Sequence, residues 1–410
     1  MFHKEVERER EKAMKRTLRE RLSKEKGIDI VIDDDDDDDD GDNGDNVDVV
    51  ASLWKGAGIV MRLKTSGEDV IVKRIDDNRR LTEITRESYR VEQRFYRYFA
   101  RDYENIPICH LQDERVANNV PKKKRKKRKS KKNSSDDDIL GSSWNFFSVF
   151  SDLSVQFPIS EEDLNYHQAL SVMKFFAKFH ATNMNHPGAA LRGGDKLIQE
   201  RLGGLWNTGT YWTLDRRRHE LETMVRNYEK ELHSRVLREH GSSLSDDIKK
   251  LSRRLHSVAE DLHNRLSPGK QNPSHWFTII HGDAKGANIL LQRHSDNTTY
   301  TASLLDFQWA GGGLGCRDIA YFMISAVDPS ALKRETELLR YYYTERRNFI
   351  LRRENKIKAK LMSWDEFLDR YEIALCDFMR WLCGYGLWGG PAERWSLERV
   401  SSILRSRLNI

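Results

Sequence analysis

The chain has 410 residues, of which 38% are hydrophobic, 33% charged and 10% aromatic. This composition suffices for one large domain or two lobes with a hydrophobic core, and it excludes a mostly disordered protein. No apolar run approaches the roughly 20 residues that cross a bilayer, and the N-terminus MFHKEVERER lacks the apolar stretch of a secretory signal. Four widely spaced Cys without a CxxC pair further predict a soluble, cytoplasmic protein with reduced thiols.

Residues 1–48 are predicted to form a charged, disordered tail. Its first 26 residues are rich in Glu, Lys and Arg, which is also compatible with an exposed helix. Asp33–Asp40 is an unbroken acidic run whose like charges repel each other and prevent packing. The run lacks the Gly and Glu placement of an EF-hand loop, so a calcium site is not favoured.

Residues 49–157 are predicted to form a small β-rich lobe. The stretch ASLWKGAGIVMRLKTSGEDVIVKRI contains β-rich runs around Gly-containing turns, the last of them at Ile71–Lys73. TRESYRVEQRFYRYFA follows, with apolar residues close to helical spacing, and WNFFSVFSDL reads as a further strand.

A basic insertion, residues 117–138, interrupts this lobe and accounts for the formal net charge of +6. Its core, Pro121–Lys132 (PKKKRKKRKSKK), holds ten Lys or Arg; without them the chain has 60 basic against 64 acidic residues. The rest of the chain therefore carries no general signature of nucleic-acid binding. The run itself is compatible with a nuclear import receptor, with contact to a polyanion, or with an inert disordered insertion.

Residues 158–410 are predicted to form a larger helical lobe that contains a short pair of strands. EEDLNYHQALSVMKFFAKFHATNM has strong helical periodicity, and residues 216–266 read as one or two long charged helices. The connector GGLWNTGTYWTL lies between them, and Trp206, Tyr211 and Trp212 are expected in the core or in a pocket wall. Pro268 and Pro273 end the helical stretch.

The segment IIHGDAKGANILLQ places reactive side chains in a short loop between two predicted strands. Asp283 could accept a proton from an attacking hydroxyl, and Lys285 offers a point charge for a phosphate. Asn288 and Asp306, which ends the next strand SLLDFQ, offer hard oxygen atoms suited to Mg²⁺. Phosphoryl transfer needs this set: an Asp that aims the nucleophile, a Lys, and metal ligands. The alternative is a purely structural role for Asp283, Asn288 and Asp306, because Asp and Asn are also favoured in turns.

HGDAKGAN followed by LLDFQWAGGGLGCRDIAYF resembles the aminoglycoside phosphotransferase and choline kinase-like group, particularly its ecdysteroid kinase-like (CHK kinase-like) branch. The resemblance covers about residues 50–345. It implies an α+β, two-lobed protein-kinase-like fold with a small β-rich N-lobe and a larger helical C-lobe. It also implies a kinase that uses ATP and Mg²⁺ to phosphorylate a hydroxyl group of a small molecule.

The resemblance also implies roles for individual residues. Lys73 in VIVKRI corresponds to the lysine on the ATP phosphates, with Glu92 on the next helix as its ion-pair partner and Glu87 as the alternative. Gly56 and Gly58 in WKGAGIV loosely resemble the loop that covers the phosphates.

In the helical lobe, Asp283 resembles the catalytic base and Lys285 a phosphate-contacting lysine, while Asn288 and Asp306 resemble the metal ligands. Asp318 in CRDIAYF resembles the acid that supports the catalytic loop, and His281 is expected to hold the loop by hydrogen bonding.

Two other functions remain open from the sequence: a protein kinase, and a catalytically inactive kinase-like binding protein. Asp318 is only twelve positions after Asp306 and no A-P-E follows, which leaves no room for a long activation segment. The intact set of Lys73, Asp283, Asn288 and Asp306 argues against an inactive protein. The identity of the substrate is not encoded in any motif of the chain.

Overall fold

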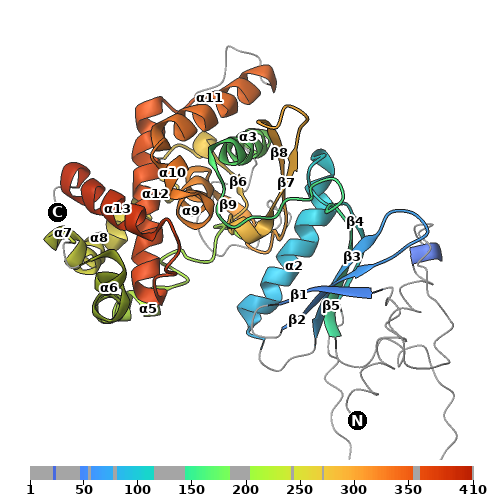
Figure 1. The fold of residues 1–410 in the computed structure, drawn as a ribbon, viewed down its shortest axis with the longest axis horizontal. Helices are drawn as coiled ribbons and strands as arrows, with labels where there is room; N and C mark the ends of the chain where they lie inside the picture. The colour runs from blue at the N-terminus through green and yellow to red at the C-terminus, as the bar shows by residue number, and fades with distance from the viewer. Residues whose placement is uncertain are drawn as a thin grey trace, which may run out of the picture. The chain divides into compact units, whose positions relative to one another are not determined.

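The computed structural model describes residues 22–24, 47–53, 57–76, 81–114, 144–184, 204–241, 244–269, 272–353 and 361–408. The chain divides into two compact units. The first unit comprises Met1–Tyr89, Ala100–Asp102 and Pro107–Leu153, and the second comprises Arg90–Phe99, Tyr103–Ile106 and Ser154–Ile410. A sheet-rich first unit and a helix-rich second unit confirm the predicted α+β class (Figure 1).

The first unit contains a five-stranded antiparallel sheet with the strand order β1-β2-β3-β5-β4. Helix α2 (Glu83–Tyr98) follows β3, and its residues belong partly to each unit. The strands are β1 (Val47–Ser52), β2 (Gly58–Leu63), β3 (Val70–Asp76), β4 (Cys109–Glu114) and β5 (Trp144–Ser151).

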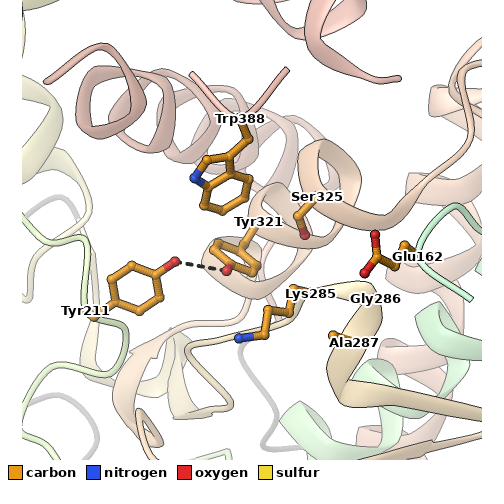
Figure 2. Close-up of a pocket in the computed structure, with 8 residues that line it drawn as sticks. All are labelled: Glu162, Tyr211, Lys285, Gly286, Ala287, Tyr321, Ser325 and Trp388. Carbon is orange, nitrogen blue, oxygen red and sulfur yellow. Dashed lines mark hydrogen bonds between the residues drawn. The ribbon is translucent and has the colours of Figure 1, made fainter. Parts of the chain in front are cut away.

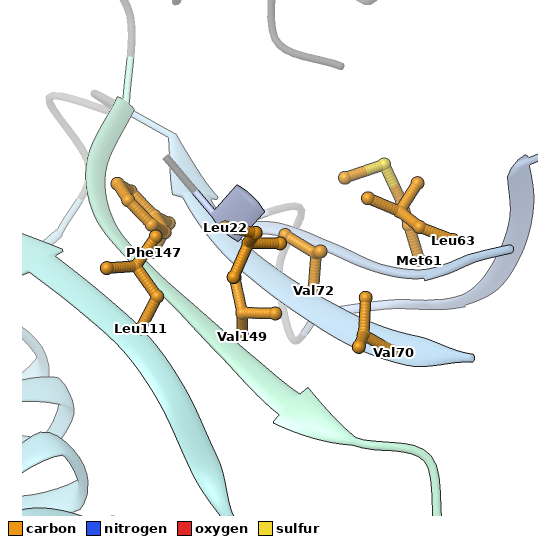
Figure 3. Close-up of a cluster of buried hydrophobic side chains, with 8 residues drawn as sticks. All are labelled: Leu22, Met61, Leu63, Val70, Val72, Leu111, Phe147 and Val149. Atoms are coloured by element: carbon orange, nitrogen blue, oxygen red, sulfur yellow. The ribbon is translucent and has the colours of Figure 1, made fainter. Parts of the chain in front are cut away.

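The sheet has two different faces, because successive side chains along each strand point to opposite sides. Met61, Leu63, Val70, Val72, Leu111, Phe147 and Val149 form a buried cluster on one face, which Leu22 joins (Figure 3). On the other face Ile75 and Phe146 pack with Tyr89 of α2. Lys73 has the same strand parity as Ile75, so it lies on the face with α2.

The backbone of the sheet, rather than a ligand, explains the glycine at position 58. Gly58 begins β2 opposite Ile75, and a Cβ atom there would lie 1.9 Å from the carbonyl oxygen of Arg74. Only a residue without a side chain fits this contact. Its predicted part in a phosphate-covering loop stays a prediction, and Gly56 lies outside the described residues.

The second unit is built mainly from helices. Helix α12 is buried along most of its length and packs against α5, α8, α9 and α13. The main helices of the second unit are α3 (Tyr166–Thr182), α5 (Arg218–Glu231), α8 (Leu251–Arg265), α9 (Cys316–Ala326), α11 (Glu335–Arg353), α12 (Trp364–Tyr385) and α13 (Glu393–Arg407). Short helices are α6 (Leu237–His240), α7 (Asp246–Lys249) and α10 (Pro329–Leu332).

Local sequence signals explain where these helices begin and end. Asn165 caps α3 and Ser363 caps α12, each in a reciprocal capping box with the side chain three residues later. The predicted helical stretch 216–266 is divided: after α5 comes a π-helical turn, Leu232–Val236, and then Gly241 with a φ of 87° ends α6. Glycine adopts this left-handed conformation without steric cost.

Two antiparallel strand pairs form a frame within the second unit. β6 (Phe277–Ile280) pairs with β9 (Gly311–Leu314), and β7 (Ile289–Arg293) pairs with β8 (Tyr300–Leu304). Ile280 lies opposite Gly311, and Ile289 lies opposite Leu304. The loops 281–288 and 305–310 are therefore both held at each end by paired strands, which brings their side chains to one place.

Most of the predicted tail 1–48, including Asp33–Asp40, and the basic run Pro121–Lys132 lie outside the described residues, so the predictions for them stay predictions. The described part of the tail departs from the prediction of disorder, because Leu22 is buried in the sheet cluster and Val47 and Asp48 belong to β1. Among the helices that the structure describes, none combines the length and the apolarity needed to cross a bilayer.

Candidate functional site

The two loops of the frame are joined to each other by hydrogen bonds. The N–H of Leu305 donates to the carbonyl of Asn288 at 2.9 Å, and His281 Nε2 lies 2.9 Å from the carbonyl of Leu305. A carbonyl only accepts, so Nε2 carries the proton and Nδ1 accepts from the N–H of Asp283 at 3.2 Å. The fully buried His281 thus connects both loops by the kind of bonds that the sequence led us to expect.

Asp318, in the first turn of α9, holds the start of the loop through its backbone. Its carboxylate accepts from the N–H of His281 at 2.7 Å and from the N–H of Gly282 at 2.8 Å. Gly282 has a φ of 82°, and a Cβ there would lie 2.3 Å from the carbonyl oxygen of Trp309. The chain therefore turns at a glycine to bring two donors onto one buried carboxylate.

Behind Asp318 lies His180 of α3, a residue that the sequence does not connect with the site. Its Nε2 lies 3.1 Å from the Asp318 carboxylate and its Nδ1 2.8 Å from the hydroxyl of Tyr342. Burial lowers the pKa of His180, and its bond to Asp318 offsets only part of this effect, so the ring is neutral near pH 7. Nε2 then donates to Asp318, and Nδ1 accepts from Tyr342.

The free energy of unfolding is expected to fall in acid because of His180. The folded protein takes up this proton at lower pH than the unfolded chain, whose His pKa is about 6.5. Stabilisation that is present above about pH 6.5 is therefore lost as the pH falls toward the folded pKa, at up to about 1.4 kcal/mol per pH unit. Urea denaturation between pH 8 and pH 5 measures this loss.

Two variants separate this contribution from other titrating groups. His180→Gln lacks the ionisation and should show a flatter pH dependence than the wild type. His256→Gln replaces an exposed histidine of α8 and should keep the wild-type dependence. Equal slopes for the wild type and His180→Gln would contradict the prediction.

The carboxylate of Asp283 is buried and receives hydrogen bonds on both oxygens. Oδ2 accepts from Lys285 Nζ and from Asn288 Nδ2, both at 3.1 Å. Oδ1 accepts from the hydroxyl of Tyr321 at 2.8 Å. The loop thus brings together Asp283, Lys285 and Asn288 as the sequence predicts, and it adds Tyr321, which lies 38 residues later in the chain.

The donor chemistry of Asn288 and Asp306 fits a hard divalent cation. Asn288 donates to Asp283 through Nδ2, and its Oδ1 accepts no hydrogen bond within the described part of the chain. Asp306 follows Leu305, whose N–H bonds to Asn288, so both residues are close in the frame. Asp306 has a φ of 64°, a left-handed conformation that Asp tolerates better than most residues. An amide oxygen beside a carboxylate is a donor set that Mg²⁺ accepts.

The predicted nucleotide-binding residues belong to different units. Lys73 on β3 is only 8% exposed, and its ammonium lies 5.8 Å from the ring centroid of Tyr89. Lys73 is therefore not a solvent-exposed strand lysine. Glu92 is buried in the part of α2 that belongs to the second unit. The ion pair between Lys73 and Glu92 stays a prediction, as does the alternative partner Glu87.

A pocket of about 270 Å³ within the second unit is lined by two hydrogen-bond partners of the Asp283 carboxylate, Lys285 and Tyr321. Figure 2 shows Tyr211, Tyr321 and Trp388 around one end of it and Glu162 with Ser325 at the other. Its lining consists of Glu162, Tyr211, Lys285, Gly286, Ala287, Tyr321, Ser325 and Trp388. Tyr211 was expected in the core or a pocket wall and lies in this wall, whereas Trp212 is buried in the core.

Tyr211 and Tyr321 form a pair whose hydroxyl oxygens lie 3.0 Å apart. Burial, and next the negative charge of Asp283, raise the pKa of both phenols well above the ordinary value. Both therefore keep their protons at any physiological pH. Tyr321 stands three residues after Asp318 in α9, so it lies on the same helix face; this spacing is the signal in CRDIAYF that could have identified it.

A family model described as ecdysteroid kinase-like matches residues 59–352, which is more than half of the chain. No curated protein sequence matches the chain.

Three solved structures are similar over most of their length. A spectinomycin phosphotransferase in complex with ADP and spectinomycin is 12% identical, with 95% of this chain and 94% of that chain covered and a TM-score of 0.45. A microcompartment-associated aminopropanol kinase is 12% identical, with coverages of 90% and 94% and a TM-score of 0.48. The GDP and kanamycin complex of APH(2″)-IIIa is 13% identical, with coverages of 88% and 91% and a TM-score of 0.44.

Proposed function

Because the chain belongs to the ecdysteroid kinase-like family, we propose that it is an ATP-dependent phosphotransferase that acts on a hydroxyl group of a small molecule. One observation carries the proposal: the buried Asp283 carboxylate is hydrogen-bonded to Tyr321 and Lys285, which both line the pocket of about 270 Å³. A pocket of this size suits a small acceptor.

In the proposed reaction Asp283 is the catalytic base. It takes the proton of the acceptor hydroxyl as the oxygen bonds to the γ-phosphorus of ATP, while the bond between that phosphorus and the β-phosphate oxygen breaks. The products are a phosphate ester and ADP, with the proton on Asp283. Lys285, whose ammonium lies 3.1 Å from Asp283 Oδ2, would balance the negative charge that gathers on the transferred group.

We assign the remaining predicted residues to the nucleotide and its metal. Asn288 and Asp306 would ligate Mg²⁺, which when bound supplies charge neutralisation for the phosphate oxygens. Lys73 on β3, with Glu92 as its ion-pair partner, would bind the phosphates. Gly56 and Gly58 would belong to the loop that covers the phosphates.

A small acceptor is favoured over a peptide by the short segment between Asp306 and Asp318. All of its residues are described; four of them form β9, which pairs with β6 and is buried. A protein kinase holds its peptide substrate on a long activation segment. The segment between Asp306 and Asp318 is too short to form one.

Transfer of labelled phosphate tests the proposal. Wild-type protein, γ-labelled ATP and Mg²⁺ are incubated with a library of hydroxyl-bearing metabolites, and labelled products are separated from ATP. At least one small molecule should become labelled. Label on a protein substrate alone would favour the protein kinase, and nucleotide binding without transfer to any acceptor would favour the inactive binding protein.

Asp306→Ala is expected to weaken binding of ATP in the presence of Mg²⁺ by about 10–100-fold, because Asp306 would hold the Mg²⁺ whose charge would offset that of the phosphates. Titration calorimetry with Mg²⁺ and with EDTA measures the effect. Asp261→Ala, at an exposed position of α8, is the matched control and should bind as the wild type does. Equal affinity of Asp306→Ala and the wild type with Mg²⁺ would remove Asp306 from the metal site.

A further inference from the structure

The hydrogen bonds from Tyr211 through Tyr321 to Asp283 have a fixed direction. An ionised carboxylate has no proton, so Tyr321 must donate in its 2.8 Å bond to Asp283 Oδ1. Its single proton is then used, and the 3.0 Å bond between the two phenols must be donated by Tyr211. The Tyr321 hydroxyl therefore accepts from Tyr211 and donates to Asp283.

Packing, rather than Asp283, sets the position of the Tyr321 hydroxyl. The Tyr321 ring is 2% exposed and lies 4.7 Å from the ring of Phe378, centroid to centroid. The rings of Trp388, at 5.9 Å, and Tyr211, at 6.2 Å, contact it edge-on. A ring enclosed by three others has little rotamer freedom, so its hydroxyl is a fixed point in the pocket wall.

Helix α9 thereby holds the loop at two successive places. Asp318 binds the backbone N–H groups of His281 and Gly282, and Tyr321, on the same helix face, binds the side chain of Asp283. The first contact fixes the path of the chain, whereas the second fixes the rotation of the carboxylate. Asp283 lies between Tyr321 on Oδ1 and the pair Lys285 and Asn288 on Oδ2.

Resting on the proposed function, we infer that Tyr321 is a positioning residue that holds the Asp283 carboxylate toward the acceptor pocket, with Tyr211 as the hydrogen-bond donor to its hydroxyl. A carboxylate oxygen accepts two hydrogen bonds, so Oδ1 can still receive the acceptor hydroxyl beside Tyr321. A base held in one orientation reacts faster than one that rotates, because misplacement by about 1 Å can cost about 10²-fold in rate.

Steady-state kinetics of Tyr→Phe variants tests this role, with MgATP as substrate and water or an acceptor from the library as the nucleophile. Tyr321→Phe should lower kcat by about 10–100-fold while KM for MgATP stays within about twofold. Tyr211→Phe, which removes the donor to the Tyr321 hydroxyl but leaves the bond from Tyr321 to Asp283, should cause a smaller loss. Tyr341→Phe on α11, whose ring lies outside the pocket lining, should match the wild type.

Crystal structures of the wild type and Tyr321→Phe give a second readout that needs no turnover. In the variant the Asp283 side chain should occupy a new or additional rotamer, while the backbone at His281 and Gly282 stays in place. An unchanged Asp283 rotamer, or an unchanged kcat, would overturn the inference. Wild-type protein that transfers phosphate to no acceptor, together with a displaced Asp283 in Tyr321→Phe, would support the positioning contact and reject the proposed function.

Discussion

Asp283→Asn is expected to lower kcat for phosphoryl transfer by about 10²–10⁴-fold, the range that a general base contributes. The amide has the shape of the carboxylate and still offers an oxygen to Tyr321 or Asn288, but it cannot take the proton of the acceptor hydroxyl. Binding of MgATP should change by only a few fold, because the proposed metal ligands are Asn288 and Asp306. Transfer of labelled phosphate gives kcat, and calorimetry gives the affinity.

Asp261→Asn makes the same chemical change at an exposed position of α8 and should leave both quantities unchanged. A wild-type kcat for Asp283→Asn would show that another group removes the proton. Loss of MgATP binding together with kcat would instead place Asp283 among the nucleotide or metal ligands.

Asp318→Ala is expected to destabilise the protein by about 3–5 kcal/mol and to abolish activity. The change leaves two buried N–H groups, of His281 and Gly282, without an acceptor, and each such loss costs about 1–3 kcal/mol. It also removes the partner of His180 Nε2. Urea denaturation gives the change in free energy, and amide hydrogen exchange at His281 and Gly282 shows whether the loop opens first.

Asp328→Ala is the informative control for Asp318→Ala, because Asp328 also accepts a backbone N–H, that of Ser330, but at the exposed start of α10. Loss of this helix cap should cost only about 1 kcal/mol. Equal effects of the two changes would mean that burial of the Asp318 bonds does not matter for stability.

The sequence predicts the frame of the site well, because local signals are sufficient there. Apolar runs on both sides of HGDAKGAN mark β6 and β7, and the spacing of Asp283, Lys285 and Asn288 within one loop requires no long-range information. The positions of Asp306 and Asp318 follow from the next strand and the next helix. These are contacts between neighbours in chain order, which periodicity and turn residues reveal.

The supports of the site come from distant parts of the chain and are not visible in this way. His180 meets Asp318 across 138 residues, and Tyr211 meets Tyr321 across 110. A tyrosine or histidine on an apolar helix face has the same pattern as a core residue, so only the packed structure distinguishes it. For residues 216–266 the sequence left one or two helices open, and Gly241 is the signal that favours the break after α6.

The length of the loop between β6 and β7 is fixed, because Ile280 and Ile289 at its two ends are each paired with a neighbouring strand. An inserted residue would have to break one ladder or turn Asn288 away from Asp283. The other end of the β7–β8 hairpin, residues 294–299, is exposed throughout and can lengthen at little cost. Related chains should therefore differ in length at that turn and keep the count between Asp283 and Asn288 constant.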